Sequence, residues 1–593
     1  MFTTVCSAAV YGLQAYLVRV EVDLAGGLPS FQLVGSLGSE VKESRERVSV
    51  AMKNSGFQIP PAHITVNLAP AGRRKDGTAF DLPIAVGLLR DMELVPEEAL
   101  QDTLFLGELG LNGEIKKVKG VLPIVQEEAK SGIRRVVVPG ENAMEAAVIP
   151  GITVWGVNCL NDLLAALNHP ELETEKVYQP RIRAEDLLRE GTGQDTGDFR
   201  EVAGQENAKR GAEIAAAGFH NLLMIGPPGV GKSMVAGRIP GILPPLTLKE
   251  SLEVTGIFSV AGLLPPGQAL ITRRPFYAPH HTVTQAALIG GGSGIPRPGM
   301  VSLAHRGVLF LDELPEFRKN VLDGMRQPME ERIVQIARSA GMVTYPSDFI
   351  LVAAMNPCPC GYYPDRNKCR CTQPQIEKYL GKISGPILDR IDLCVELHPV
   401  DILHLQKTKT EKSSEDMKRQ IRHARERQAE RFAGTDCRFN GDIRSALVEE
   451  YCPFWFEEPV DADDYEGYKK VAAKSAIPIA GGENESTRYG FRDLINTQAV
   501  SILNPDATCT GGVTEFLKIA SLASANGVAM SPHGQQQVHI HLDCAVPGSI
   551  LAEFYPPQYD AKVYEAFKNP IIMNADGTIS PGKERSEEHT SEL

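Results

Sequence analysis

The stretch that decides the fold of the central domain runs from residue 221 to residue 233 and reads NLLMIGPPGVGKS. Its first five residues predict an apolar strand, which leads into a glycine-rich loop and then into a helix. Glycines let backbone N–H groups curl around an anion, and the helix N-terminus adds a partial positive charge. The lysine can reach the β- and γ-phosphates of ATP, and the serine can ligate Mg²⁺. The residues expected to bind ATP are Gly226, Gly229, Gly231, Lys232 and Ser233.

A second apolar strand downstream ends in two carboxylates, Asp312 and Glu313. Asp312 is expected to hold the Mg²⁺ ion with its hydration shell, and Glu313 to orient and deprotonate the attacking water. A third strand precedes Asn356, which could orient the water or the γ-phosphate. Arg390 is a candidate arginine finger that neutralises charge on the transferring phosphoryl group, with a surface ion pair as the alternative. Together these residues predict Mg²⁺-dependent ATP hydrolysis.

The composition is that of an ordinary globular protein. The chain has 593 residues, 43% hydrophobic and 23% charged, and at about 150 residues per domain this length predicts three or four domains. No apolar run reaches the roughly 18 residues of a membrane helix, and no secretion signal is evident, so we expect a cytoplasmic protein without a membrane partner. The net charge of −13 argues against a protein that is basic throughout, but it permits a local basic surface for nucleic acid.

Pattern and composition divide the chain into five segments. Residues 1–170 alternate strand and helix signals and predict an α/β domain, whereas 171–197 is polar and predicts a linker. Residues 198–442 predict the second α/β domain. Residues 443–584 repeat short strands that end in polar residues, a rhythm typical of a (β/α) barrel. The predicted fold class is therefore α/β multidomain, with a partial barrel before a separate tail at 585–593.

Four motifs point to one family: PFYAPHH at 275–281, ALIGGG at 287–292, LAH at 303–305 and NPCPCG at 356–361. Through them, residues 1 to about 440 resemble the Mg-chelatase-like AAA+ family, which includes the competence protein ComM and YifB. The resemblance implies a P-loop AAA+ core in a hexameric ring whose inserts face a central pore and grip branched or single-stranded DNA. It implies ATP-driven branch migration or helicase work in recombination and natural transformation. A motor subunit of a metal chelatase, which shares the ATPase core, is an alternative.

The same resemblance places a hairpin before Asn356. Arg332 and Arg338 on this hairpin are candidate DNA contacts, and solvated hairpin charges are the alternative.

The N-terminal segment carries a second resemblance, through KDGTA at 75–79, GEL at 107–109 and residues 121–139. These motifs resemble the proteolytic domain of Lon, which shares its fold with ribosomal protein S5. Lon-type enzymes use a serine nucleophile and a lysine base, but here the serine position falls on Ala79 and the lysine position on Ile124. We therefore expect no peptidase activity. A scaffold, or a DNA or partner surface, is the expected role, for which the basic residues Arg73, Arg74 and Lys75 are suited.

Four of the eleven cysteines lie close together in the sequence, and the odd total argues against a disulfide framework. They form two C-x-C pairs separated by eight residues: Cys358, Cys360, Cys369 and Cys371. Four thiolates this close could bind tetrahedral Zn²⁺, although C-x₂-C is the usual spacing. Free, reduced thiols in a cytosolic loop are the alternative.

The segment after residue 443 ends its predicted strands in an ordered series of polar groups: Glu457, Glu483, Asp506, His533 and Glu553. This series resembles the C-terminal half of an enolase-superfamily barrel of the mandelate racemase and sugar-acid dehydratase group. The resemblance implies that Glu457 and Glu483 ligate Mg²⁺, that His533 paired with Asp506 is the general acid or base, and that Glu553 hydrogen-bonds the enolate. The third metal ligand and the lysine base belong upstream, where this chain carries the AAA+ core. A sugar-acid dehydratase or racemase is thus an alternative function, expected only as an inactive fragment.

Two features of the C-terminal half suggest an origin for this arrangement. The AAA+ family continues past Asp442 into a helical lid with a second-sensor arginine, which we do not find, so weak or no turnover is expected. The last nine residues, RSEEHTSEL, resemble the translation of a common sequencing adapter.

These features lead to the hypothesis that the chain joins two unrelated reading frames and an adapter. Long-read sequencing of the genomic locus is then expected to show no continuous coding sequence across codons 440 to 450. One uninterrupted read across that interval would contradict the hypothesis.

Overall fold

The computed structural model describes residues 2–190, 197–292, 294–338, 341–399, 412–443, 454–475, 477–555, 570–574 and 578–581. The chain forms two compact units, Met1–Asp442 and Ile443–Leu593, and the adapter-like stretch 585–593 lies outside the described residues. Within the described residues, no helix is both long enough and apolar enough to span a bilayer.

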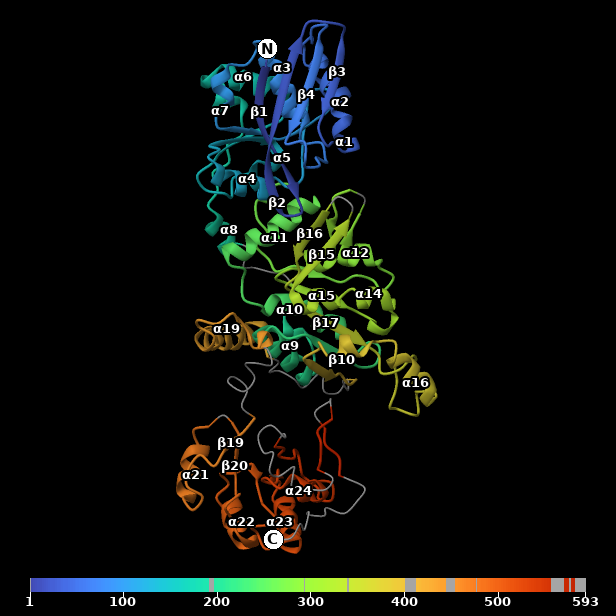
Figure 1. Ribbon diagram of the computed structural model, residues 1–593, viewed down its shortest axis with the longest axis vertical. Coiled ribbons are helices and arrows are strands. Elements are labelled where there is room, and N and C mark those ends of the chain that lie inside the picture. The colour runs from blue at the N-terminus through green and yellow to red at the C-terminus, as the bar shows by residue number, and fades with distance from the viewer. Residues whose placement is uncertain are drawn as a thin grey trace. The chain divides into compact units, whose positions relative to one another are not determined.

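The first unit begins with a seven-stranded mixed sheet of strand order β3-β4-β2-β1-β5-β8-β9 (Figure 1). The longest strands, β1 and β2, form an antiparallel hairpin, whereas β5, β8 and β9 pair in parallel. β4 buries every second residue, as expected for a strand with one face on a core. The strands, with the small β6–β7 hairpin, are β1 (Phe2–Tyr11), β2 (Gln14–Ala25), β3 (Ser30–Val34), β4 (His63–Ala69), β5 (Thr103–Phe105), β6 (Glu108–Leu109), β7 (Ile115–Lys116), β8 (Arg135–Pro139) and β9 (Thr153–Val157).

Eight helices accompany this sheet in the described residues up to 190. Helix α3 is buried along most of its length and packs on β1 and β2. The helices are α1 (Ser39–Lys42), α2 (Ser44–Asn54), α3 (Asp81–Asp91), α4 (Val121–Glu128), α5 (Gly140–Ala146), α6 (Leu160–Asn168), α7 (Glu173–Lys176) and α8 (Ala184–Glu190). The last two fall within the predicted linker. Ala184 of α8 is buried with Val148 and Leu270, so the described part of this segment packs on the unit rather than crossing solvent.

The second sheet of this unit is parallel, with strand order β11-β14-β17-β10-β18. Strands β14 and β17 are buried at every position because helices cover both faces. Alternate residues of β17 enter two cores: Val352 packs with α9 and α10, and Leu351 packs on the opposite face. The strands are β10 (Leu222–Ile225), β11 (Phe276–Tyr277), β14 (Val308–Leu311), β17 (Ile350–Met355) and β18 (Leu393–Glu396), with hairpins β12 (Gly290–Gly291)–β13 (Arg297–Pro298) and β15 (Ile333–Arg338)–β16 (Gly341–Pro346).

The helices around this sheet follow the strands in the alternation typical of α/β domains. They are α9 (Glu206–Gly218), α10 (Lys232–Ile242), α11 (Leu248–Ala261), α12 (Gln285–Ile289), α13 (Met300–Leu303), α14 (Lys319–Asp323), α15 (Arg326–Glu331), α16 (Gln373–Leu380), α17 (Gly385–Leu388) and α19 (Ser414–Arg431).

The second unit contains a four-stranded parallel sheet in sequence order, β19-β20-β21-β22, with helices between the strands. Phe491 and Phe516, from two of these helices, are fully buried in its core. The elements are β19 (Phe456–Glu457), α21 (Tyr465–Ala472), β20 (Ile479–Gly481), α22 (Thr487–Asn496), β21 (Ile502–Leu503), α23 (Val513–Ala525), β22 (Ala529–Met530) and α24 (Gln536–Asp543). This confirms the predicted β/α rhythm. The described strands number half of the eight that close a (β/α) barrel.

A buried ionic network ties the end of the first unit to its parallel sheet. The carboxylate of Asp348, just before β17, lies 2.6 Å from Arg306, 2.7 Å from Arg438 and 3.4 Å from Arg332. Burial alone would raise the pKa of the Asp348 carboxyl, but the three guanidinium groups together hold this pKa below its usual value. Arg332 also pairs with Asp442, so the network fixes the last residues of the unit.

Removing the charge at the centre of this network should destabilise the first unit. We expect Asp348→Asn to reduce the free energy of unfolding by about 3–5 kcal/mol, because three arginines lose a shared buried anion. Asp323→Asn, which breaks an exposed pair with Arg326, is the matched control and should cost less than about 1 kcal/mol. Thermal unfolding followed by circular dichroism measures both variants, and equal midpoints would contradict the assigned role.

Candidate functional site

The glycine-rich loop connects the end of β10 to the start of α10, and each of its glycines meets a specific backbone requirement. Gly229 and Gly231 have φ of +79° and +94°, which side chains disfavour. A Cβ at Gly226 would lie 2.6 Å from the carbonyl oxygen of Leu397. The N–H of Gly226 donates to the carbonyl of Met355 at 3.2 Å, which fixes the loop to the adjacent strand β17.

Lys232 at the first turn of α10 folds back into this loop. Its Nζ donates to the carbonyl oxygens of Gly226 at 2.6 Å and Pro227 at 3.0 Å, and to Oδ1 of Asn356 at 3.0 Å. Burial lowers the pKa of Lys232, while the nearby carboxylate of Asp312 opposes this shift. The loop thus holds an ammonium group where it can approach an anion bound by the loop amides.

The two carboxylates that follow β14 have different partners. Asp312 Oδ2 accepts a hydrogen bond from the hydroxyl of Ser233 at 2.9 Å, so the two predicted magnesium ligands are in contact. Glu313 adopts a left-handed conformation with φ of +54°, and its side chain lies 3.1 Å from Nδ1 of His281. The sequence predicts no catalytic role for His281, which belongs to the family motif at 275–281. The adjacent pair His280–His281 was the available signal for this contact.

Strand order explains why residues more than a hundred positions apart meet here. β14, β17 and β10 are neighbouring parallel strands, so their carboxyl ends share one edge of the sheet. At that edge lie Asp312 after β14, Asn356 after β17 and the glycine loop after β10. This edge is the usual ligand-binding position of open parallel sheets.

In the second unit, four of the predicted enolase-type residues, Glu457, Glu483, Asp506 and His533, lie at or just after the carboxyl ends of β19 to β22, and Glu553 lies near Glu457. Nε2 of His533 lies 3.3 Å from Glu483, and its Nδ1 lies 3.7 Å from Asp506. Burial raises the pKa of Glu457, and the negative charges of Glu553 and Glu483 contribute to the same shift. Four acidic groups and an imidazole therefore share one site. The described residues of this site do not form a cluster of three potential metal ligands.

Comparison with known proteins identifies the first unit. The model "Magnesium chelatase, subunit ChlI" matches residues 198–405, and the related model "Subunit ChlI of Mg-chelatase" matches residues 20–142. An uncharacterised protein of Mycobacterium bovis is 43% identical over 442 residues, which are 74% of this chain and 86% of that protein. The competence protein ComM of Haemophilus influenzae is 40% identical over 457 residues, 76% of this chain and 86% of ComM. The chain belongs to the Mg-chelatase-like ComM/YifB family.

The end of the chain matches a different family. The model "Enolase C-terminal domain-like" matches residues 433–583. D-galactonate dehydratase of Ralstonia pickettii is 44% identical over 86 residues, which are 14% of this chain and 22% of the dehydratase. The crystal structure of L-talarate dehydratase from Polaromonas, with Mg and L-glucarate, is 35% identical over 23% of this chain and 38% of that one, with a TM-score of 0.20. The chain thus spans less than half of these relatives.

The candidate arginine finger of this ComM/YifB-type core lies away from its own nucleotide loop. The carbonyl of Arg390 accepts a hydrogen bond from Asn221, at the amino end of β10, 2.8 Å away. The glycine loop follows the carboxyl end of the same strand. The Arg390 guanidinium pairs with Glu330. The structure therefore does not bring Arg390 to the site of the same chain.

The two hairpin arginines differ in their surroundings. Arg332 is engaged by Asp348 and Asp442 and stacks over Phe219 at 5.2 Å, so it is not available to DNA in this conformation. Arg338, at the end of β15, is exposed, and its guanidinium donates to the neighbouring carbonyl of Ala337.

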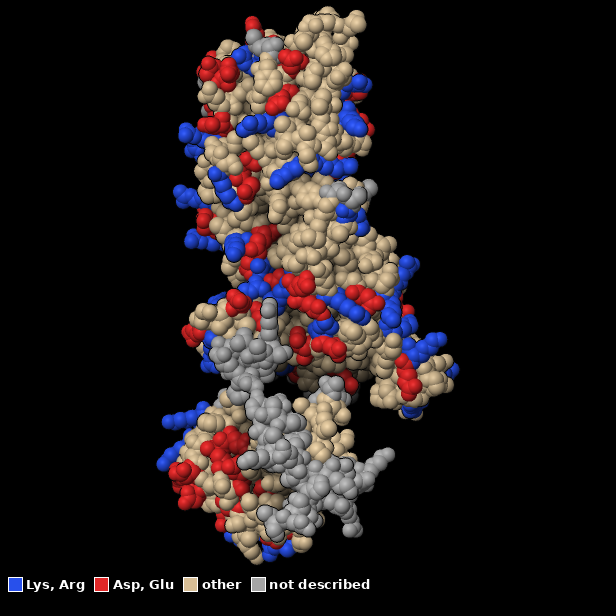
Figure 2. Space-filling view, in the orientation of Figure 1, with Lys and Arg blue, Asp and Glu red and all other residues tan. Residues whose placement is uncertain are grey.

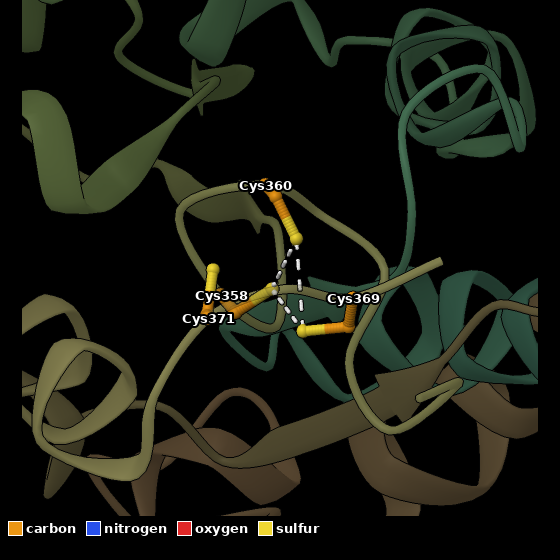
Figure 3. Close-up of side chains that lie close together, drawn as sticks. All are labelled: Cys358, Cys360, Cys369 and Cys371. Atoms are coloured by element: carbon orange, nitrogen blue, oxygen red, sulfur yellow. Dashed lines mark hydrogen bonds between the residues drawn. The ribbon is translucent and has the colours of Figure 1, made fainter. Parts of the chain in front are cut away.

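The four cysteines are brought together by the loop between β17 and α16 (Figure 3). All four sulfur atoms lie within 4.8 Å of one another, and Cys358 and Cys369 are buried. A hydrogen bond from the backbone of Tyr362 is the main cause that lowers the pKa of Cys360 to about 6.

The positions that correspond to the Lon serine and lysine, Ala79 and Ile124, line one cavity of about 660 Å³. Neither side chain can act as a nucleophile or a base. The proposed basic surface nearby is only partly available, because Lys75 is fully buried and donates to the carbonyl of Pro70. Arg74 pairs with Asp76 at 3.0 Å. Lys75 is thus a structural residue rather than a partner contact.

Proposed function

We propose that the chain binds and hydrolyses ATP with Mg²⁺. The observation that carries this proposal is the contact between Ser233 and Asp312, next to the glycine-rich loop that holds the side chain of Lys232. A hydroxyl and a carboxylate 2.9 Å apart are the oxygen ligands that Mg²⁺ prefers next to a triphosphate. The loop amides and Lys232 hold the β- and γ-phosphates, and Glu313 orients and deprotonates the attacking water.

The His281 contact suggests how Glu313 is kept ready for this step. An imidazole 3.1 Å from the carboxylate holds the side chain in one rotamer when the nucleotide is absent. Asn356, which accepts a hydrogen bond from Lys232, is the residue that we propose to contact the γ-phosphate. These residues orient the water and the terminal phosphate, and bound Mg²⁺ supplies the remaining charge neutralisation.

We propose that ATP turnover drives movement on DNA, as the competence relative suggests, in branch migration or helicase work during recombination and natural transformation. Figure 2 shows basic and acidic side chains interspersed over the visible face of the first unit, so DNA that binds this face would contact a local element rather than a broad basic patch. The exposed end of the β15–β16 hairpin, with Arg338, is that element. A metal-chelatase motor is the alternative, and DNA dependence separates the two.

A hexameric ring is part of this proposal. Arg390 is remote from the nucleotide loop of its own chain, so it can serve as a finger only for a neighbouring subunit. We further propose a cytoplasmic location, where ATP is present and free cysteines stay reduced. Because the chain continues after Asp442 into an enolase-type unit instead of the family's lid, turnover should be slow. We propose no sugar-acid chemistry for that unit, because two carboxylates underligate Mg²⁺.

Substitutions in the nucleotide site should separate binding from hydrolysis. We expect Lys232→Ala to weaken binding of a fluorescent ATP analogue by at least about 100-fold, because a buried charge-assisted contact to phosphate is lost. Glu313→Gln should retain binding but slow phosphate release at least about 100-fold, because the base is removed. Lys130→Ala, which removes only an exposed ion pair with Glu127, is the control and should change neither binding nor phosphate release. Equal affinity of Lys232→Ala and the unchanged protein would refute the proposal.

The hairpin should contribute to DNA affinity independently of ATP. We expect Arg338→Ala to weaken binding to branched DNA by about 3- to 10-fold and to flatten its salt dependence, as for loss of a phosphate contact. Arg134, in the domain with the seven-stranded sheet, has a side chain that is 85% exposed. As the control, Arg134→Ala should change neither the DNA affinity nor its salt dependence. Fluorescence anisotropy over a salt series measures both. A response to Arg134→Ala as large as that to Arg338→Ala would remove the hairpin from the DNA interface.

A further inference from the structure

Cysteine side chains supply four of the six residues in the small core of the loop between β17 and α16. Its small core consists of Cys358, Cys369 and Ile376, with Cys360, Tyr363 and Cys371 packed around them. In this small core, cysteine sulfur atoms therefore occupy positions that larger apolar side chains fill in an ordinary hydrophobic core. A loop of this kind needs a cross-link, and the structure contains no disulfide among these cysteines.

The spacing of the sulfur atoms fits a tetrahedral metal better than free thiols. A Zn–S bond of about 2.3 Å places two sulfurs of a tetrahedron about 3.8 Å apart. In the structure, Cys358 lies 3.4 Å from Cys360 and 3.7 Å from Cys369, and Cys360 lies 3.6 Å from Cys369 (Figure 3). Cys371 completes the group within 4.8 Å.

The donor set and its surroundings select the metal. Four sulfur ligands without any carboxylate favour Zn²⁺ over Mg²⁺ or Ca²⁺. The backbone N–H of Tyr363 points at Cys358 Sγ with a separation of 3.4 Å, a hydrogen bond that supports a thiolate ligand. Two ligands are buried and two are half-buried, so the site is shielded but still partly accessible to solvent.

The same loop contacts the glycine-rich loop and its Lys232 at two points. Asn356, which accepts the hydrogen bond from Lys232, is only two residues before Cys358. Gly361 has φ of +87°, and a Cβ there would lie 2.5 Å from Cδ of Pro228 in the glycine-rich loop. Ile376 of α16 joins the far end of the cysteine loop to the same small core. A cross-link at the cysteines therefore limits the positions that Asn356 and the glycine-rich loop can take.

We propose that Cys358, Cys360, Cys369 and Cys371 bind one structural Zn²⁺, and that the zinc-bound loop positions Asn356 at the nucleotide site. The first part is independent of ATP hydrolysis, and the second rests on the proposed nucleotide binding. In this proposal Asn356 positions Lys232 by accepting its hydrogen bond, and the zinc-bound cysteines affect the nucleotide site only by fixing the position of Asn356.

Elemental analysis of the full-length protein, purified without chelator, tests the metal site. We expect one zinc per chain, its loss in the double variant Cys360→Ser/Cys371→Ser, and full retention in the control Cys509→Ser, an exposed cysteine of the second unit. If the double variant fails to fold, exchange of the unchanged protein into Co²⁺ provides a second measurement, because four thiolates give cobalt an intense visible absorption. Absence of zinc, with four freely titratable thiols and no cobalt spectrum, would overturn the site.

Gly361→Val tests the positioning role separately. This variant should keep its zinc but bind the ATP analogue about tenfold more weakly, because a side chain at this left-handed position must displace Pro228 of the glycine-rich loop. Zinc removal should weaken binding by a similar factor, and reloading should restore it. If both leave affinity unchanged while Lys232→Ala abolishes it, the zinc is structural only and the positioning role is wrong. If the unchanged protein does not bind the analogue, the proposed ATPase fails, whereas the zinc measurement stands.

Discussion

The ammonium group of Lys232 sits inside a turn of backbone, and this interaction depends on the geometry of the whole first unit. A buried ammonium needs acceptors, and it finds them in two carbonyls of its own loop and in Asn356 from another strand. Asn356 is available only because β17 lies beside β10 in parallel register. Asp312 reaches Ser233 for the same reason, since β14 pairs with the other side of β17. A slip of one residue in either pairing would displace the ligands and move core side chains to the wrong face.

The ionic network at Asp348 performs a related task at the opposite end of β17. It links the start of that strand to Arg332, at the base of the β15–β16 hairpin, and to the segment 438–442. The stacking of Phe439 on Phe219 at 5.2 Å adds to this attachment. The enolase-type family model begins at residue 433, but these contacts keep the residues up to Asp442 in the first unit. Structural and family boundaries therefore differ by about ten residues.

Much of the nucleotide site could be predicted from the sequence, because its chemistry is encoded in short contiguous motifs. Residue type and spacing in the sequence are enough to recognise the glycine-rich loop, the Asp312–Glu313 pair and the enolase-type series. Other features could not be predicted in this way. The burial of Lys75, the engagement of Arg332 by two aspartates, and the contact of His281 with Glu313 each depend on a partner distant in the sequence. A basic residue in a polar stretch has the same local pattern whether it faces solvent or a buried carboxylate.

The sequence by itself determined the fold class, the family of each unit and the residue types of the sites, because strand and helix periodicity and loop chemistry are properties of neighbouring residues. Only the tertiary structure decided which of these residues act together. It brought the cysteine-containing loop between β17 and α16 against the glycine-rich loop, and it separated Arg390 from the nucleotide loop of its own chain. The physical reason is that strand order in a parallel sheet is set by burial of both faces against helices, and this packing is not written in any single segment.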